Sequence, residues 1–145
     1  MRIYLDTCCL QRPFDDQTQL RIRVETEAVL AILSAVQAGD LVLLTSEALE
    51  YEIRRIPDEQ RRREASAILV LASERLLLNE KSEALACALE RSGISSMDAL
   101  HVALASEASA NYFATTDDRL LKRLKPLETI NCQPISLLGL LSEVT

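Results

Sequence analysis

Four acidic residues that lie far apart in the sequence are the candidates for chemistry: Asp6, Glu52, Asp98 and Asp117. Asp6 directly follows the short apolar run at 3–5, which is typical of a strand buried inside a sheet. Asp117 follows a similar run at 112–115. If these two strands are parallel, their carboxyl ends and both acids lie at the same edge of the sheet, where ligands bind in open α/β folds.

Glu52 lies in a predicted helix that also carries Glu47 and Glu50, so one of the three has to be chosen. The apolar residues of this helix share a face with Glu52, whereas Glu50 lies among polar residues. Glu47 is in the first turn, where a negative charge suits the helix dipole. Glu52 is therefore the candidate. The alternative is a boundary glutamate whose stem packs while its carboxylate reaches water.

The other acids also have structural interpretations. Asp6 could be a turn-forming or capping residue, and Asp98 has the spacing from Ser95 that a capping box requires. One of Asp117 and the adjacent Asp118 is expected to cap the following helix, and the choice of the fourth acid between them stays open. His101, one turn after Asp98, is expected to pack or hydrogen-bond rather than to bind a metal.

If the four acids converge, their charges require a cation. Oxygen ligands select hard ions, so the sequence predicts Mg²⁺ or Mn²⁺. Such ions can activate water and neutralise the leaving oxygen in phosphodiester hydrolysis. We expect Asp6 and Asp98 to be the main metal ligands, and Glu52 and Asp117 to complete the cluster or orient water.

The composition fits one folded domain spanning residues 1–145, with 48% apolar and 26% charged residues. A net charge of −6 argues against a nonspecific polyanion binder but not against a nuclease, whose site must be acidic to hold metal. Asp6 interrupts the first apolar run, so no secretory signal is predicted, and no stretch approaches the roughly 20 apolar residues of a membrane span. Four cysteines without a C-x-x-C pair indicate reduced thiols in a cytoplasmic protein.

The segments that would position the acids alternate between strands and helices. Strands are predicted at 2–5, 41–44, 75–78, 112–115 and 129–130. Helices are predicted at 18–38, 46–55, 58–72, 80–91, 95–110, 117–124 and 136–141, and the segment 7–17, which contains Pro13, is predicted to be irregular. The order strand, helix, strand over residues 2–44 is a βαβ unit, so its strands should be parallel. The sequence predicts one α/β domain.

Four short motifs in this order make the chain resemble PIN domains, and more narrowly the VapC-like ribonuclease toxins of toxin–antitoxin pairs. They are Ile3-Tyr4-Leu5-Asp6-Thr7, Ser46 with Glu52, Asp98-Ala99-Leu100-His101-Val102-Ala103, and Thr115-Thr116-Asp117 with Leu120. Each motif alone is weak, but four in the family's order over residues 3–120 are fairly specific.

The resemblance implies a parallel sheet of about five strands between helices and cleavage of RNA that depends on Mg²⁺ or Mn²⁺. It transfers the family's four acids to Asp6, Glu52, Asp98 and Asp117. It also implies a homodimer and an antitoxin partner, which often brings a basic side chain to the acidic site. The chain departs from the family at Cys8, where Asn or Ser is usual, and in the segment 12–16, so the choice of RNA is open.

Arg12 and Arg119 lie in segments that adjoin the predicted site and could hold RNA phosphates, although ordinary solvated surface is the alternative. Two other functions are alternatives to a ribonuclease. One is a non-catalytic PIN-like module that binds RNA or protein. The other is a phosphotransfer domain acting through Asp6, which is disfavoured because Cys8 stands where a second Asp is needed. The sequence names neither the RNA nor the partner, and does not separate a toxin from a housekeeping ribonuclease.

Overall fold

The computed structural model describes residues 1–145, and it contains five strands and eight α-helices. The strands are β1 (Arg2–Leu5), β2 (Val42–Ser46), β3 (Glu74–Leu76), β4 (Tyr112–Ala114) and β5 (Gln133–Ile135). The helices are α1 (Thr7–Gln11), α2 (Leu20–Gln37), α3 (Glu47–Arg54), α4 (Glu59–Leu69), α5 (Glu80–Arg91), α6 (Ser96–Glu107), α7 (Asp118–Leu124) and α8 (Leu137–Val144), with a 3-10 turn η1 (Arg12–Phe14). All strand pairs are parallel, in the order β3-β2-β1-β4-β5. The predicted α/β fold is confirmed.

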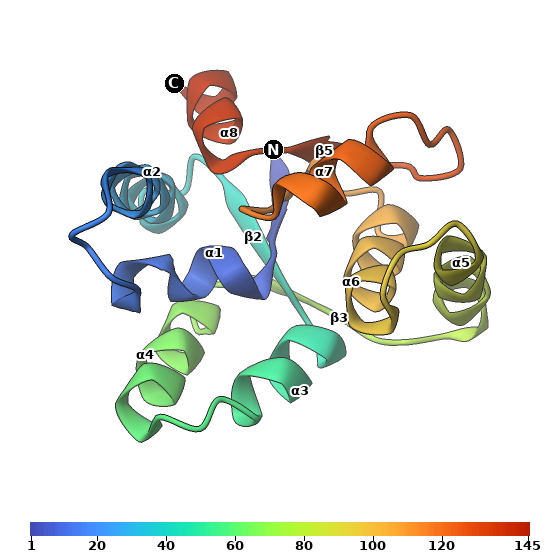
Figure 1. Ribbon diagram of the computed structural model, residues 1–145, viewed down its shortest axis with the longest axis horizontal. Helices are drawn as coiled ribbons and strands as arrows, with labels where there is room; N and C mark the ends of the chain where they lie inside the picture. The colour runs from blue at the N-terminus through green and yellow to red at the C-terminus, as the bar shows by residue number, and fades with distance from the viewer.

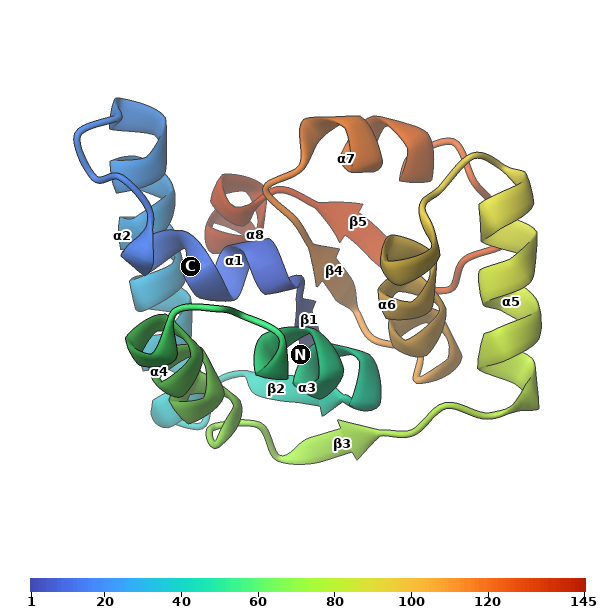
Figure 2. The same ribbon diagram turned by 60° about the horizontal axis from the view of Figure 1, so that its bottom comes forward.

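Helices cover both faces of this sheet. Helices α2, α4 and α8 lie on one side, and α5 and α6 lie side by side on the other (Figures 1 and 2). The chain changes faces because the strand order reverses: it runs outward from β1 to β3, then crosses to β4 and β5. Right-handed crossovers in the two directions place their helices on opposite faces. The order reverses between β1 and β4, and folds of this kind bind ligands at such a switch point.

Strand β1 is the centre of both the sheet and the core. Tyr4 and Leu5 are fully buried, and the ring of Tyr4 stacks on Phe113 with 5.6 Å between ring centroids. Leu5 pairs with Ala114 of β4, and the backbone N–H of Asp6 continues the pairing to the carbonyl of Ala114 at 2.9 Å. The exits of β1 and β4 are therefore adjacent, as the two strand-exit acids require.

The prediction of an irregular segment at 7–17 was wrong over most of its length, because it contains α1 and η1. Asp6 begins α1, since its side chain accepts from the N–H of Thr7. Pro13 falls in the first turn of η1, where a missing backbone donor costs nothing. The proline therefore starts a helical turn here instead of breaking one.

The last strand lies at Gln133–Ile135 and not at 129–130. This strand contains Pro134, which is tolerated because β5 pairs only with β4 and lies at the edge of the sheet. The remaining differences are shifts of element ends: β2 continues to Ser46, β3 covers Glu74–Leu76, α6 stops at Glu107 and α8 extends to Val144. All four cysteines are free, and no helix has the length and apolar character needed to cross a membrane.

Candidate active site

Asp6 lies at the end of β1 with its side chain almost completely buried, at 5% exposure. Its Oδ1 accepts from the N–H of Thr7 at 2.8 Å, and its Oδ2 accepts from the hydroxyl of Thr115 at 2.9 Å and the thiol of Cys8 at 3.4 Å. Burial raises the pKa of Asp6 well above its ordinary value, and the nearby charge of Asp98 adds to the effect. This carboxylate is held by neutral donors and lacks a positive partner.

Glu52 reaches the same place from α3. That helix begins where Ser46 accepts from the N–H of Leu49 at 3.0 Å. The Oε1 atom of Glu52 accepts from the hydroxyl of Thr7 and lies 2.8 Å from Nε2 of His101. Burial alone would raise the pKa of Glu52, but these hydrogen bonds outweigh it and lower the pKa, so the carboxylate is ionised near neutral pH.

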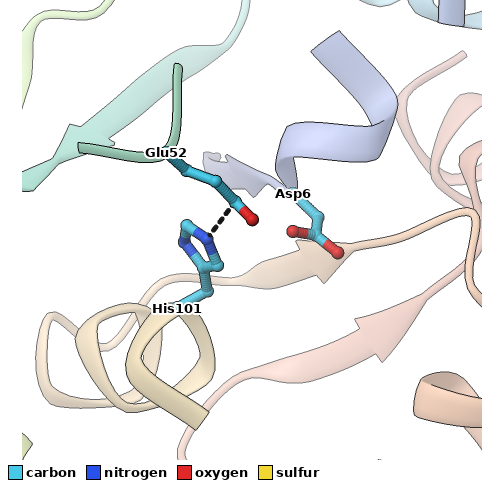
Figure 3. Close-up of side chains that lie close together, drawn as sticks. All are labelled: Asp6, Glu52 and His101. Atoms are coloured by element: carbon cyan, nitrogen blue, oxygen red, sulfur yellow. Dashed lines mark hydrogen bonds and ion pairs between the residues drawn. The ribbon is translucent and has the colours of Figure 1, made fainter. Parts of the chain in front are cut away.

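Asp6, Glu52 and His101 each offer a ligand atom, and these atoms lie within 4.8 Å of one another. In Figure 3 the carboxylates of Asp6 and Glu52 point toward one another, and the imidazole of His101 contacts Glu52 from α6. Both ring nitrogens of His101 are engaged, with Nδ1 2.6 Å from the hydroxyl of Tyr4. The expectation that His101 is a hydrogen-bonding residue is confirmed.

Asp98 lies in the first turn of α6 and is half-buried. The capping-box alternative is wrong, because the side chain of Ser95 does not cap α6; its hydroxyl instead donates to Oδ2 of Asp98 at 2.9 Å. Asp98 lines a cavity of about 160 Å³ together with Asp117 and Arg119. Asp98 and Asp117 therefore line one cavity, but neither belongs to the group of ligand atoms formed by Asp6, Glu52 and His101. That Asp98 is a main metal ligand stays a prediction.

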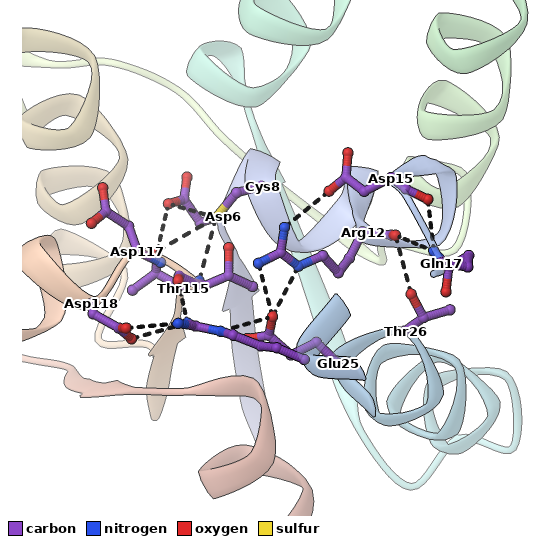
Figure 4. Close-up of polar contacts among 12 residues, drawn as sticks. Asp6, Cys8, Arg12, Asp15, Gln17, Glu25, Thr26, Thr115, Asp117 and Asp118 are labelled. Carbon is purple, nitrogen blue, oxygen red and sulfur yellow. Dashed lines mark hydrogen bonds and ion pairs between the residues drawn. The ribbon is translucent and has the colours of Figure 1, made fainter. Parts of the chain in front are cut away.

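Asp117 caps α7, because its Oδ1 accepts from the N–H groups of Arg119 and Leu120 at 3.0 and 3.2 Å. Its own N–H donates to the hydroxyl of Thr115 at 3.1 Å, and that hydroxyl donates in turn to Asp6 (Figure 4). Asp117 can therefore cap α7 and also line the cavity that contains Asp98.

Asp118 points elsewhere and forms an ion pair with Arg21 at 2.8 Å. Of the two neighbouring acids, only Asp117 lines the cavity that contains Asp98. The geometry favours Asp117 as the fourth acid.

The four candidate acids share one electrostatic property: none forms an ion pair with an arginine or lysine, and only Glu52 contacts an imidazole. Six other acids do pair with arginines, namely Asp15, Glu25, Glu50, Glu59, Glu74 and Asp118. Carboxylates gathered without a basic partner favour a bound cation. Their oxygen donors are the type that Mg²⁺ and Mn²⁺ prefer, so the donor set fits such an ion.

The two arginines suggested for RNA contact differ in their surroundings. Arg12 is held in ion pairs with Asp15 at 3.0 Å and Glu25 at 2.8 Å, which join the segment after α1 to α2 (Figure 4). Arg119 is exposed, forms no ion pair and lines the cavity beside Asp98 and Asp117. Contact of either arginine with RNA stays a prediction, and only Arg119 has a free guanidinium.

Thr7 and Thr115 were not among the candidate residues, although both contact the candidate acids. Thr7 bonds to Glu52 through its hydroxyl and to Asp6 through its N–H, and Thr115 connects Asp6 with Asp117. A signal was present in the sequence, since each threonine lies within two positions of a candidate acid at a strand exit. Hydroxyl groups there are suited to orient carboxylates.

Several solved structures share this fold. Over 95% of this chain and 99% of the other, VapBC-1 from nontypeable Haemophilus influenzae superposes with a TM-score of 0.60 at 16% identity. VapBC2 from Rickettsia felis, bound to a DNA fragment from its promoter, matches with a TM-score of 0.58 at 14% identity, over 92% of this chain and 98% of that one. PAE2754 from Pyrobaculum aerophilum superposes with a TM-score of 0.59 at 17% identity, over 99% of this chain and 89% of the other.

Identities this low establish a likeness of fold alone. No curated protein matches the sequence. The sequence model of the PIN domain does match, over residues 3–125, which is most of the chain and contains all four acids. The protein therefore belongs to the PIN-domain family.

Proposed function

We propose that this protein is a metal-dependent endoribonuclease that hydrolyses RNA phosphodiester bonds, and that it is the toxin of a toxin–antitoxin pair. The observation that carries the proposal is that Asp6 and Glu52 offer carboxylate oxygens within 4.8 Å of each other, and that Asp98 and Asp117 line a cavity linked to Asp6 through Thr115. The PIN family supports nuclease chemistry, and the likeness in fold to the VapBC structures supports the narrower role.

In this proposal Asp6 and Asp98 hold Mg²⁺ or Mn²⁺, with Glu52 and Asp117 completing the cluster or orienting water. When bound, such an ion supplies the positive charge that the phosphodiester needs during hydrolysis. The protein contributes rigid carboxylates: Asp6 is fixed by three donors, and Glu52 by Thr7 and His101. The exposed guanidinium of Arg119 is placed to bind a phosphate of the RNA next to the acids.

The test is cleavage of a mixed RNA pool with Mg²⁺, Mn²⁺ or EDTA, comparing the natural protein with Asp98→Asn. Asp98 is half-buried and bonds only to Ser95, so this variant should fold. Asp118→Asn is the matched control, since Asp118 pairs with Arg21 away from the cavity. We expect metal-dependent cleavage that Asp98→Asn abolishes and Asp118→Asn retains. Absence of cleavage with either metal, in folded protein free of antitoxin, would favour the non-catalytic binding module instead.

The proposed partners are an antitoxin and a second copy of this chain. The carboxylates of Asp98 and Asp117 in the cavity of about 160 Å³ could accept a basic side chain of an antitoxin, which would compete there with Arg119 and Arg123. Co-purification with the product of a neighbouring gene, and loss of inhibition when its basic residue is replaced, would test this partner. Sedimentation of the purified chain would test the homodimer. We place the activity in the cytoplasm, where free thiols such as the four cysteines persist.

A further inference from the structure

A chain of buried hydrogen bonds joins the first two strands to Glu52. The hydroxyl of Tyr4 lies 2.7 Å from Oγ of Ser46 and 2.6 Å from Nδ1 of His101, and Nε2 of His101 lies 2.8 Å from Oε1 of Glu52. Tyr4, Ser46 and His101 are each 0% exposed, so water does not compete for these groups. At its far end, Ser46 accepts from the N–H of Leu49.

The acceptors in this chain decide where the protons lie. An ionised carboxylate only accepts hydrogen bonds, so Nε2 of His101 must carry a proton and donate to Glu52. In the neutral imidazole Nδ1 is then an acceptor, so Tyr4 donates to His101 and Ser46 donates to Tyr4. In this single arrangement the hydroxyls of Tyr4 and Ser46 each donate one hydrogen bond and accept one. A nitrogen that carries a proton has no lone pair for a metal ion, in either charge state of the ring.

We infer that His101 is a positioning residue, held by Tyr4 and Ser46, which fixes the carboxylate of Glu52 and does not itself bind the metal. With the donor from Thr7, two hydrogen bonds converge on Oε1 of Glu52. Oε2 is left without a protein donor, and the carboxylate points toward Asp6 (Figure 3). The inference deepens the proposed function and rests on it for the role of Glu52, but the proton positions are independent of it.

The first measurement is long-range ¹H–¹⁵N NMR of the imidazole in the full chain, in which His101 is the only histidine and needs no assignment. In EDTA we expect a proton on Nε2, and after addition of Mg²⁺ we expect that proton to remain. A bare Nε2 in EDTA, or loss of its proton with Mg²⁺, would overturn the inference. Tyr4→Phe removes the donor to Nδ1, but Glu52 still accepts from Nε2, so we expect the proton to stay on Nε2 while the Nδ1 resonance shifts; an unchanged Nδ1 resonance would exclude a role for Tyr4.

The second measurement uses two replacements of His101. A glutamine amide reaches the place of Nε2 and can still donate to Glu52, whereas an asparagine amide reaches only the place of Nδ1. Replacing groups that orient a ligand typically weakens metal binding by about 10–100-fold, so we expect His101→Asn to weaken Mn²⁺ binding about tenfold or more. His101→Gln should stay within about threefold, since it keeps the donor. Equal affinity in both folded variants, or equal loss, would overturn the positioning role.

Failure of the positioning role can be distinguished from failure of the proposed nuclease function. If the RNA pool is never cleaved but the proton positions and the contrast between the glutamine and asparagine variants hold, the nuclease proposal fails and the positioning of Glu52 stands. If cleavage occurs while both variants bind Mn²⁺ as the natural protein does, the nuclease stands and the positioning role is refuted.

Discussion

Asp6→Asn should stabilise the metal-free protein, although it replaces a fully hydrogen-bonded residue at the start of a helix. Asparagine keeps an oxygen to accept from the N–H of Thr7, and the hydroxyl of Thr115 can turn to accept from the new amide. The variant thus removes a buried charge and leaves the cap in place. The buried charge of Asp6 has hydrogen bonds but no positive partner, so we expect its removal to raise the free energy of unfolding by about 1–3 kcal/mol.

The gain should depend on pH with a definite sign. Since the pKa of Asp6 is raised by folding, the stability contributed by its protonated form is fully present below the ordinary value of 3.8. That stability is lost as pH rises through the higher folded value. The advantage of Asp6→Asn is therefore expected to be absent in acid below 3.8, to grow as pH rises toward the raised pKa and to level off above it.

Mn²⁺ should counteract the advantage. A ligand at 100 times its dissociation constant stabilises the folded state by about 2.7 kcal/mol, and the natural protein should gain this while Asp6→Asn gains little. The assay is urea unfolding followed by circular dichroism, in EDTA and in Mn²⁺, at several pH values. Asp118→Asn, at an exposed ion pair, is the control and should stay within about 0.5 kcal/mol and keep its response to Mn²⁺. Lower stability of Asp6→Asn in EDTA at neutral pH would refute the reasoning, because the hydrogen bonds would then outweigh the cost of burying the charge.

Three further changes test other parts of the structure. Glu52→Gln should lower the rate of RNA cleavage by about 10–100-fold, as loss of a metal-site carboxylate does, while Glu50→Gln on the same helix should leave it within about twofold, measured with equal Mn²⁺. Phe113→Ala should lower the free energy of unfolding by about 3–5 kcal/mol in urea, because its ring is fully buried. Gly93→Ala should destabilise by about 1 kcal/mol or more, as Gly39→Ala should, because both glycines have positive φ, at 94° and 84°.

The sequence was sufficient to predict the parts of the site that follow from strand and helix periodicity. Asp6 and Asp117 were placed together because parallel strands end at one edge, and β1 and β4 are indeed neighbours. Glu52 was separated from Glu50 by the apolar face of its helix, and in the structure Glu50 pairs with Arg75 while Glu52 contacts Thr7 and His101. The spacing of apolar residues within single strands and helices was enough to make these two predictions.

Contacts between distant segments could not be predicted in this way. The hydrogen bonds from Tyr4 to His101 and from Thr7 to Glu52 join positions separated by 97 and 45 residues, and no periodicity relates them. The last strand was predicted at 129–130 instead of Gln133–Ile135, and its place at the edge, where Pro134 is tolerated, depends on the assembled sheet. Local signals fixed the type of most elements, and tertiary packing fixed the rest.

The order of the chain also has a consequence for synthesis. Asp6 is translated before Thr115, which holds its carboxylate and follows 109 residues later, together with strand β4, which pairs with β1. A chain still attached to the ribosome therefore lacks a complete acidic cluster until residue 117 has emerged and β4 has entered the sheet. The proposed nuclease activity would therefore be held back until these late segments have folded against β1.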